Sequence, residues 1–252
     1  MTNGLFDLTG KIAVVTGAST GLGAGIARAL AAAGADLFLA DHAERPELRR
    51  EIAAMGRRVE GMTADLRAPG APASVTAAAL KAFGRIDILV NNAGIIRRRP
   101  ALEAAESDWD DVLAVNAKAP FLLAQAAARD MVRRKAGKII NIASLLSFQG
   151  GILVPSYAAS KGAIAQLTKA LANEWASSGI NVNAIAPGYM ETDNTKALRE
   201  DPVRSKAILD RIPAGRWGTP ADVGGTAVFL ASRASDYVNG HVLAVDGGWL
   251  AR

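Results

Sequence analysis

The sequence has 252 residues, of which 50% are hydrophobic and 21% are charged, so it can bury a large core and does not resemble a disordered chain. It contains no cysteine and only two, widely separated histidines, His42 and His241, which excludes disulfides and predicts no metal site. The net charge of +5 and the pI of about 9.7 would suit a nucleic-acid partner, but the charges are spread along the chain without a nucleic-acid-binding motif, so we expect none.

The N-terminal residues MTNGLFDLTGK lack the basic start and the following apolar run of a signal peptide. No apolar stretch reaches the roughly 18 residues that a membrane span requires. We therefore expect a cytoplasmic protein that has no membrane partner.

Apolar runs rich in β-branched residues alternate with alanine-rich helical stretches along the whole chain. Most of the runs are continuous, as in strands that are covered on both faces, and such alternation is typical of a parallel sheet with right-handed crossovers. We predict one α/β domain over residues 1–252, a Rossmann-like, doubly wound sheet of about seven parallel strands with helices on both faces. The predicted strands cover residues 11–17, 36–41, 58–65, 87–94, 138–144, 181–188 and 242–248.

Two long helices are predicted near residues 107–135 and 157–178, and both carry small apolar side chains on more than one side. A symmetric oligomer would bury the second apolar face of these helices. Residues 189–219 are different in character, because they are polar, irregular and contain two prolines. We expect this section to form a loop or lid over the substrate.

The first predicted strand leads through a glycine-rich turn into a helix, in the stretch VVTGASTGLGAGIARAL at residues 14–30. Glycines permit a tight turn and a close backbone approach, and the N–H groups of the helix N-terminus favour a pyrophosphate. A tight turn without a ligand is the alternative, but the position between strand and helix favours a dinucleotide site. The predicted contacts are Gly17, Ser19, Thr20, Gly21, Leu22 and Gly23.

The second predicted strand ends at Asp41, 24 residues after Gly17. A carboxylate at this place can accept hydrogen bonds from both hydroxyls of an adenosine ribose, and it repels a 2′-phosphate. The nearest basic residues are His42 and Arg45. The sequence therefore favours NAD over NADP, the alternative being that Asp41 only caps the following helix.

Further motifs follow in a fixed order: NNAG at 91–94, Asn116, Ser144, YAASK at 157–161 and PG at 187–188. Together with the glycine turn, which reads TGxxxGxG, they make the chain resemble the short-chain dehydrogenase/reductase family over essentially its full length. The resemblance implies a homotetramer in which the two long helices are paired. It also implies a catalytic tetrad of Asn116, Ser144, Tyr157 and Lys161.

The resemblance implies cofactor contacts at the ends of the later strands as well. Asp65 and Leu66 would flank the adenine. Next to the cofactor, Asn92 would face away from it. The other implied contacts are Asn91, Ala93 and Gly94 beneath the cofactor, and Pro187, Gly188 and Thr192 at its nicotinamide end, together with Tyr157 and Lys161.

The spacing of Tyr157 and Lys161 places a phenol one helical turn from an ammonium group. A neighbouring positive charge lowers the pKa of a phenol from about 10, so Tyr157 could act as a base in alcohol oxidation and as an acid in ketone reduction. Ser144 would hold the substrate oxygen. The resemblance adds that Lys161 donates to the nicotinamide ribose and that Asn116 holds a water molecule.

Arg97, Arg98 and Arg99 follow the fourth predicted strand at the expected active-site edge. At least one of them could bind a substrate carboxylate through two hydrogen bonds, the alternative being that all three are solvated. Aromatic residues make up only 5% of the chain, which favours a small, polar, acidic substrate. The remaining candidate substrate contacts are Gln149, Tyr189 and Arg216.

Four longer stretches resemble the branch of this family that oxidises or reduces ketodeoxygluconates. The branch implies 2-dehydro-3-deoxy-D-gluconate or 2-deoxy-D-gluconate as the substrate, with gluconate as an alternative. A 3-oxoacyl-carrier-protein reductase shares the fold and the tetrad, but usually takes NADPH, which Asp41 disfavours. A cofactor-binding sensor without turnover would have no use for Tyr157 and Lys161 together. The stretches are NIASLLSFQGGILVPSYAASK, ANEWASSGINVNAIAPGYMETDNT, ILDRIPAGRWGTPAD and SDYVNGHVLAVDGGWLAR.

Overall fold

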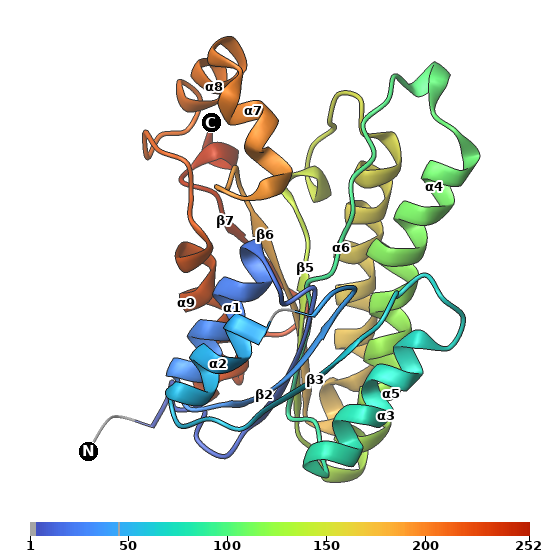
Figure 1. Ribbon diagram of the computed structural model, residues 1–252, viewed down its shortest axis with the longest axis vertical. Coiled ribbons are helices and arrows are strands. Elements are labelled where there is room, and N and C mark those ends of the chain that lie inside the picture. The colour runs from blue at the N-terminus through green and yellow to red at the C-terminus, as the bar shows by residue number, and fades with distance from the viewer. Residues whose placement is uncertain (1–3, 45) are drawn as a thin grey trace.

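Seven parallel strands form one sheet in the order β3-β2-β1-β4-β5-β6-β7, in a computed structural model that describes residues 4–44 and 46–252 (Figure 1). All seven predicted strands are confirmed, within a few residues at each end. The order reverses between β1 and β4, which creates the crevice where doubly wound sheets bind ligands. The strands are β1 (Ile12–Thr16), β2 (Asp36–Asp41), β3 (Val59–Thr63), β4 (Ile88–Asn91), β5 (Gly137–Ile142), β6 (Ile180–Pro187) and β7 (Val242–Val245).

Helices cover both faces of the sheet, so the predicted doubly wound architecture is confirmed (Figure 1). One face packs against α1, α2 and α9, and the other against α3, α5 and α6. The bounds are α1 (Gly21–Ala32), α2 (Pro46–Ala54), α3 (Ala71–Phe83), α4 (Glu106–Leu113), α5 (Ala119–Arg134), α6 (Pro155–Trp175), α7 (Lys196–Glu200), α8 (Pro202–Leu209) and α9 (Pro220–Ala231). Single turns are η1 (Ala101–Glu103), η2 (Ala114–Lys118), η3 (Leu145–Ser147), η4 (Ala176–Ser178), η5 (Asp193–Thr195), η6 (Arg233–Ser235) and η7 (Trp249–Ala251).

Strand β1 shows why the sequence runs are continuously apolar. All five of its residues are buried. Ala13 and Val15 pack on the side of α1 and α9, whereas Val14 packs on the side of α3 and α5. Because successive side chains point to opposite faces and both faces are covered, no position in the strand is free to be polar and exposed.

The long helix predicted over 107–135 is interrupted. Helix α4 ends at Leu113, residues Ala114–Lys118 form a π turn, η2, and α5 continues from Ala119. The helix predicted over 157–178 begins earlier, at Pro155, since proline is well suited to the first turn of a helix. It ends at Trp175 and is followed by η4.

The section at 189–219 stands above the carboxyl ends of the strands and is less irregular than the sequence suggests (Figure 1). It contains η5, α7 and α8, of which α8 begins at a strong cap, since Asp201 accepts hydrogen bonds from the N–H groups of Val203 and Arg204. Its apolar side chains pack with residues from near the C-terminus, Trp249 and Leu250. The section is therefore held above the carboxyl ends of the strands by its own small hydrophobic cluster.

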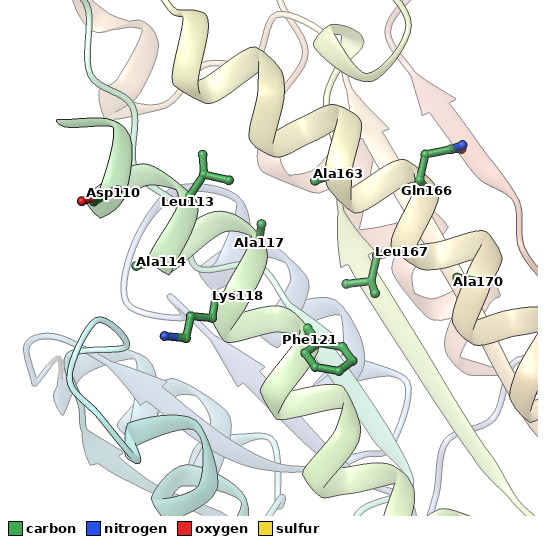
Figure 2. Close-up of a pocket in the computed structure, with 10 residues that line it drawn as sticks. All are labelled: Asp110, Leu113, Ala114, Ala117, Lys118, Phe121, Ala163, Gln166, Leu167 and Ala170. Atoms are coloured by element: carbon green, nitrogen blue, oxygen red, sulfur yellow. The ribbon is translucent and has the colours of Figure 1, made fainter. Parts of the chain in front are cut away.

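An apolar groove of about 770 Å³ lies on the outer surface between α4, η2 and α5 on one side and α6 on the other (Figure 2). The groove is lined by Asp110, Leu113, Ala114, Ala117, Lys118, Phe121, Ala163, Gln166, Leu167 and Ala170.

Within residues 4–44 and 46–252, no helix is both long enough and apolar enough to cross a membrane.

Candidate active site

The glycine turn after β1 packs directly against the backbone that follows β4. Gly17 has a φ of +61°, and a Cβ added there would lie 2.8 Å from the Cα of Ala93. A Cβ at Gly23 would lie 2.0 Å from the carbonyl oxygen of Gly17. Only glycine fits at these two places, so the turn keeps a bare backbone.

Two side chains that are not among the expected cofactor contacts hold this turn in place. The Asn92 side chain donates from Nδ2 to the carbonyl oxygens of Thr16 and Gly17, each at 2.9 Å. The Thr16 hydroxyl oxygen accepts from the backbone N–H groups of Asn92 and Ala93, each at 3.1 Å. The first half of the sheet is thereby joined to the second at the switch point.

The turn has the properties that a pyrophosphate requires. Helix α1 begins directly behind it, its N-cap residue Thr20 is extended, and its first turn contains no acidic residue. Gly21 has a φ of +52°, and a Cβ there would meet only the side chain of Thr192, at 3.5 Å. These residues fit the phosphates of a dinucleotide, and Thr192 lies opposite the turn, on the section above the active edge.

Both carboxylate oxygens of Asp41 have hydrogen-bond partners that lie before helix α2. Its Oδ2 accepts from the backbone N–H of Ser19 at 2.7 Å, and its Oδ1 accepts from the N–H of His42 at 2.6 Å. The ring nitrogen Nδ1 of His42 is also 2.6 Å from that Oδ1. Asp41 therefore links the glycine turn to the end of β2. The other basic residue expected nearby, Arg45, lies outside the described residues.

Asp65 and Leu66 follow β3, but Asp65 has an unforeseen partner. Arg67 donates to it at 2.8 Å, and this hydrogen bond lowers the pKa of Asp65 to about 2. Arg67 also reaches Asp111 at 3.2 Å. Leu66 is partly buried against the core on the side of α3 and α5, so this corner of the site is well fixed.

The Asn91 side chain points into the core. It is buried, and its Nδ2 donates to Oδ1 of Asn141 at 2.9 Å and to the carbonyl oxygen of Pro120 at 3.2 Å. The amide nitrogen thus bonds to the neighbouring strand β5 and to α5, whereas Oδ1 is buried without a hydrogen-bond partner among the described residues. An inward-facing amide N–H group is stabilised by such partners within the core.

Tyr157 and Lys161 lie one turn apart on α6, as predicted from their spacing. The Lys161 Nζ is 5.5 Å from the centre of the Tyr157 ring. Lys161 is only 4% exposed, and it donates from Nζ to the carbonyl oxygen of Ile142 at 2.6 Å. Burial lowers the pKa of Lys161 to about 8.

The expected lowering of the Tyr157 pKa by Lys161 is not what the geometry produces. Burial raises the pKa of Tyr157, while a hydrogen bond with Ser144 and the positive charge of Arg98 act to lower it. The ammonium is directed at Ile142 rather than at the phenol oxygen. Ser144 and Arg98 are therefore the groups that act against the effect of burial on the pKa of Tyr157.

Ser144 and Ser147 surround the Tyr157–Lys161 pair from the segment after β5. The Ser144 side chain caps the turn η3 by accepting from the N–H of Leu146 at 3.2 Å. The Ser147 hydroxyl donates to the carbonyl oxygen of Lys161 at 2.7 Å, a contact that the sequence did not indicate. Both serines therefore tie the end of β5 to helix α6.

Asn116 is not a helix cap, because it lies within the π turn η2, and π turns are frequent at functional sites. Its Oδ1 accepts from the N–H of Ile95 at 2.8 Å, and its Nδ2 donates to the carbonyl oxygen of Ile95 at 2.9 Å. The same Nδ2 donates to the hydroxyl oxygen of Ser160 at 3.1 Å. Both amide hydrogens are used in this way, so the side chain cannot donate to the expected water molecule.

The candidate arginines have different partners. Arg97 is paired with Asp108 and Asp111 of α4, at 3.4 and 3.5 Å. Arg216 is held by both carboxylate oxygens of Asp222 in α9, at 2.7 and 2.8 Å.

Arg98 differs from both. Its side chain donates to the carbonyl oxygen of Asn194 in η5 at 3.1 Å, and its positive charge acts to lower the pKa of Tyr157. Among these arginines, Arg98 thus contacts the section above the strand ends and acts on Tyr157 through its charge. Arg99 donates through its backbone N–H to the carbonyl oxygen of Leu153.

Gln149 and Tyr189 meet at an aromatic cluster that the sequence did not predict. The Tyr189 ring centre is 4.6 Å from that of Trp249 and 5.6 Å from that of Trp217. The indole N–H of Trp249 donates to Oε1 of Gln149 at 3.3 Å. Three aromatic residues, Tyr189, Trp217 and Trp249, therefore form an apolar wall beside the site.

Pro187, Gly188 and Thr192 come at and after the end of β6. The N–H of Gly188 donates to the carbonyl oxygen of Val245 at 2.9 Å, and a Cβ at Gly188 would lie 2.6 Å from the Cα of Asp246. Thr192 caps η5 through a capping box with Thr195. These contacts hold the entrance to the upper section close to the sheet.

Comparison with known proteins gives consistent matches over the whole chain. A family model described as enoyl-(acyl carrier protein) reductase matches residues 17–250. The chain is 59% identical over 249 residues to 2-dehydro-3-deoxy-D-gluconate 5-dehydrogenase of Escherichia coli, and the match covers 98% of both chains.

Two crystal structures share the fold. One, from Agrobacterium tumefaciens with bound NADP, is a candidate 2-deoxy-D-gluconate 3-dehydrogenase. It is 56% identical, with a TM-score of 0.93 over 99% of this chain and 100% of that chain. The other is a gluconate 5-dehydrogenase from Burkholderia cenocepacia in complex with NADP and tartrate. It is 40% identical, with a TM-score of 0.94 over 99% of this chain and 98% of that chain.

Proposed function

The chain belongs to the short-chain dehydrogenase/reductase family, and we propose that it interconverts a secondary alcohol and a ketone of a sugar acid with a nicotinamide cofactor. One observation carries the proposal: Tyr157 and Lys161 lie one turn apart on α6, with the Lys161 Nζ 5.5 Å from the centre of the Tyr157 ring, and the positive charge of Arg98 acts on Tyr157. A proton-transfer group thus stands beside a cation suited to a carboxylate. The relatives named for sugar acids support the substrate class.

Each residue of this site has its own role in the proposed reaction. A bound nicotinamide supplies the acceptor or donor of the hydride. Tyr157 exchanges the proton of the reacting oxygen, and the Ser144 hydroxyl hydrogen-bonds to the same oxygen and stabilises charge there. Lys161, held against Ile142, supplies a buried ammonium beside the phenol and a donor for the ribose of the cofactor.

We propose NAD as the preferred cofactor, held by Gly17, Gly21 and Gly23 at the pyrophosphate and by Asp41 at the ribose. The Asp41 carboxylate would repel a 2′-phosphate. Two of the relatives were crystallised with NADP, so NADP is the competing choice. The His42 ring beside Asp41 is the feature of this chain that favours that alternative, because it can share the carboxylate charge.

We propose that the substrate is 2-dehydro-3-deoxy-D-gluconate or 2-deoxy-D-gluconate, and that its carboxylate contacts Arg98. In this arrangement the carboxylate replaces the carbonyl oxygen of Asn194 as a partner of the guanidinium. Gluconate is the second candidate, supported by the gluconate 5-dehydrogenase that shares the fold. Gln149 and Tyr189, which lie at the aromatic cluster, would contact the sugar hydroxyls.

We also propose that the protein is a homotetramer in which the groove between α5 and α6 is covered by a second copy (Figure 2). Seven of the ten lining side chains are apolar, four of them alanines, and Phe121 is about one-third exposed. An exposed apolar surface of this kind is typical of a protein–protein contact.

The experiment that tests the proposed function is a panel of sugar acids, assayed with NAD and NADP in both directions. The panel includes 2-dehydro-3-deoxy-D-gluconate, 2-deoxy-D-gluconate and gluconate, with the uncharged amide of each as a control. We expect turnover of at least one acid and preference for NAD. Turnover of 3-oxoacyl thioesters together with no turnover of any sugar acid would refute the proposal.

A further inference from the structure

Ser160 is a fully buried residue of α6 with an unusual pair of hydrogen bonds. Its hydroxyl donates to the carbonyl oxygen of Tyr157, three residues earlier, at 2.7 Å. Its oxygen accepts from Nδ2 of Asn116 at 3.1 Å. Because the hydroxyl proton is already used, the oxygen can only accept from Asn116, and this fixes which end of the amide faces α6.

Asn116 transmits this contact to the loop after β4. Its side chain binds both the N–H and the carbonyl oxygen of Ile95, at 2.8 and 2.9 Å. Ile95 directly follows the NNAG motif and is three residues before Arg98. Ser160 therefore connects the turn of α6 that carries Tyr157 to the loop that carries Arg98, across the π turn η2.

The same helix contains a second pair with the same chemistry. Thr168 is also fully buried, donates to the carbonyl oxygen of Ile164 at 2.8 Å, and accepts from Nδ2 of Asn141 at 3.0 Å. Asn141 lies within β5 and bonds to Asn91, so this pair joins α6 to the sheet. The two hydroxyls differ in what their asparagine holds, since Asn116 holds the loop beside the active site.

We propose that Ser160 is a positioning residue for catalysis, which acts through Asn116 to keep the loop at residues 94–98 in register with Tyr157. The inference rests on the proposed function, because it assumes that substrate is held between Arg98 and Tyr157. It assigns a role to the hydroxyl of Ser160 itself, since an alanine would preserve the helix but leave the Asn116 amide with one partner fewer.

The kinetic test compares Ser160→Ala with Thr168→Val, which removes the matched hydroxyl. We expect Ser160→Ala to lower kcat about tenfold, and to leave the dissociation constants of the cofactor within about twofold of those of the wild type. Thr168→Val should lower the melting temperature by a similar amount but leave kcat unchanged. An equal loss of kcat in both variants, or none in Ser160→Ala, would overturn the proposal.

A double-variant cycle shows whether the effect passes through Asn116. If it does, Ser160→Ala should add less than about a twofold further loss of kcat to Asn116→Ala, because the two changes break one chain of contacts. Losses that multiply would mean that Ser160 acts by another route, which contradicts the proposal.

Hydrogen exchange of the cofactor-free protein supplies a readout that needs no substrate. The N–H of Ile95 donates to Asn116, so peptides containing residue 95 should exchange faster in Ser160→Ala and at the wild-type rate in Thr168→Val. Unchanged exchange in Ser160→Ala overturns the proposal whether or not a sugar acid is turned over. Faster exchange with no turnover of any acid would refute the proposed substrate and not the contact.

Discussion

The Lys161 ammonium is directed at the carbonyl oxygen of Ile142, at the end of β5, with an Nζ-to-oxygen distance of 2.6 Å. The side chain is buried, and its burial lowers the pKa of Lys161 from 10.5 to about 8. A buried lysine in which burial disfavours the charged form destabilises the folded protein, so its retention at this place calls for a functional reason.

We therefore predict that Lys161→Met is more stable than the wild type at pH 7 and catalytically inactive. The pKa of Lys161 is lowered on folding, so the unfolded chain binds more protons between about pH 8 and 10.5. The destabilisation is complete below pH 8, corresponds to about 3 kcal/mol, and is relieved as the pH rises toward 10.5.

Denaturant unfolding of both proteins at pH 7 and at pH 10.5 measures this effect. The advantage of Lys161→Met should be about 1–3 kcal/mol at pH 7 and should shrink at the higher pH. Lys169→Met, on the exposed side of the same helix, is the control, and should change stability by less than about 0.5 kcal/mol. An advantage that grows with pH would contradict the assignment.

Replacing Tyr157 with Phe removes only the phenol oxygen from α6. We predict that Tyr157→Phe lowers kcat by about a hundredfold or more, because the proton of the reacting oxygen then has no donor or acceptor. Cofactor binding, followed by the quenching of tryptophan fluorescence, should stay within about threefold of the wild type. A variant that keeps more than about a tenth of the wild-type rate would show that another group moves the proton.

Asp41 both repels a 2′-phosphate and holds the N–H of Ser19, so two replacements separate these effects. Asp41→Asn keeps an oxygen for Ser19 but removes the charge, and it should shift the ratio of kcat/KM for NAD over NADP toward NADP. Asp41→Ala should shift the ratio and also weaken binding of both cofactors, because the glycine turn loses an anchor. If the wild-type enzyme already prefers NADPH, the charge of Asp41 does not decide the choice.

The groove between α5 and α6 predicts the state of assembly. Light scattering at micromolar concentration should give the mass of four 26.1 kDa chains. Ala170→Arg places a charge in the groove and should dissociate the assembly, whereas Ala73→Arg on the exposed side of α3 should not. A wild-type protein that elutes and scatters as a monomer would refute the proposed tetramer.

The sequence predicted the sheet and the edge at which the site lies because both depend on local patterns. Each strand is a continuous apolar run, and Gly17, Asp41, Asn91 and Ser144 all come at or just after the end of such a run. Parallel strands bring their carboxyl ends to one edge, so order along the chain was enough to gather these residues.

The details of the site that local patterns could not predict depend on contacts between residues far apart in the sequence. The π turn at Asn116 has no signature in a stretch that is alanine-rich on both sides. The Asn91 side chain turned inward because Asn141 and Pro120 offered partners. Arg216 looked like a ligand for a substrate anion, but Asp222 of α9 lies opposite it. Identical arginines are distinguished only by the acidic groups that the fold places near them.

The arginines supply the last prediction, which concerns recognition of the substrate carboxylate. Within the described part of the chain, the Arg98 side chain donates to a backbone carbonyl in the section above the site, whereas Arg97 and Arg216 are each paired with carboxylates. A carboxylate ligand would offer Arg98 a stronger, charged partner in place of Asn194. We expect Arg98→Met to lower kcat/KM for the acid by about 10- to 150-fold, and to change turnover of the uncharged amide much less.

Arg97→Met and Arg216→Met are the matched controls for this prediction, since each removes an arginine near the active edge whose charge is already balanced. Both should keep the preference for the acid over the amide within about threefold of the wild type. Steady-state kinetics of the three variants with an acid and its amide measure the preference directly. If Arg98→Met leaves the preference intact while Arg97→Met or Arg216→Met removes it, the carboxylate lies elsewhere. If no variant changes it, or if the wild type turns over the amide equally well, the site does not select its substrate by charge.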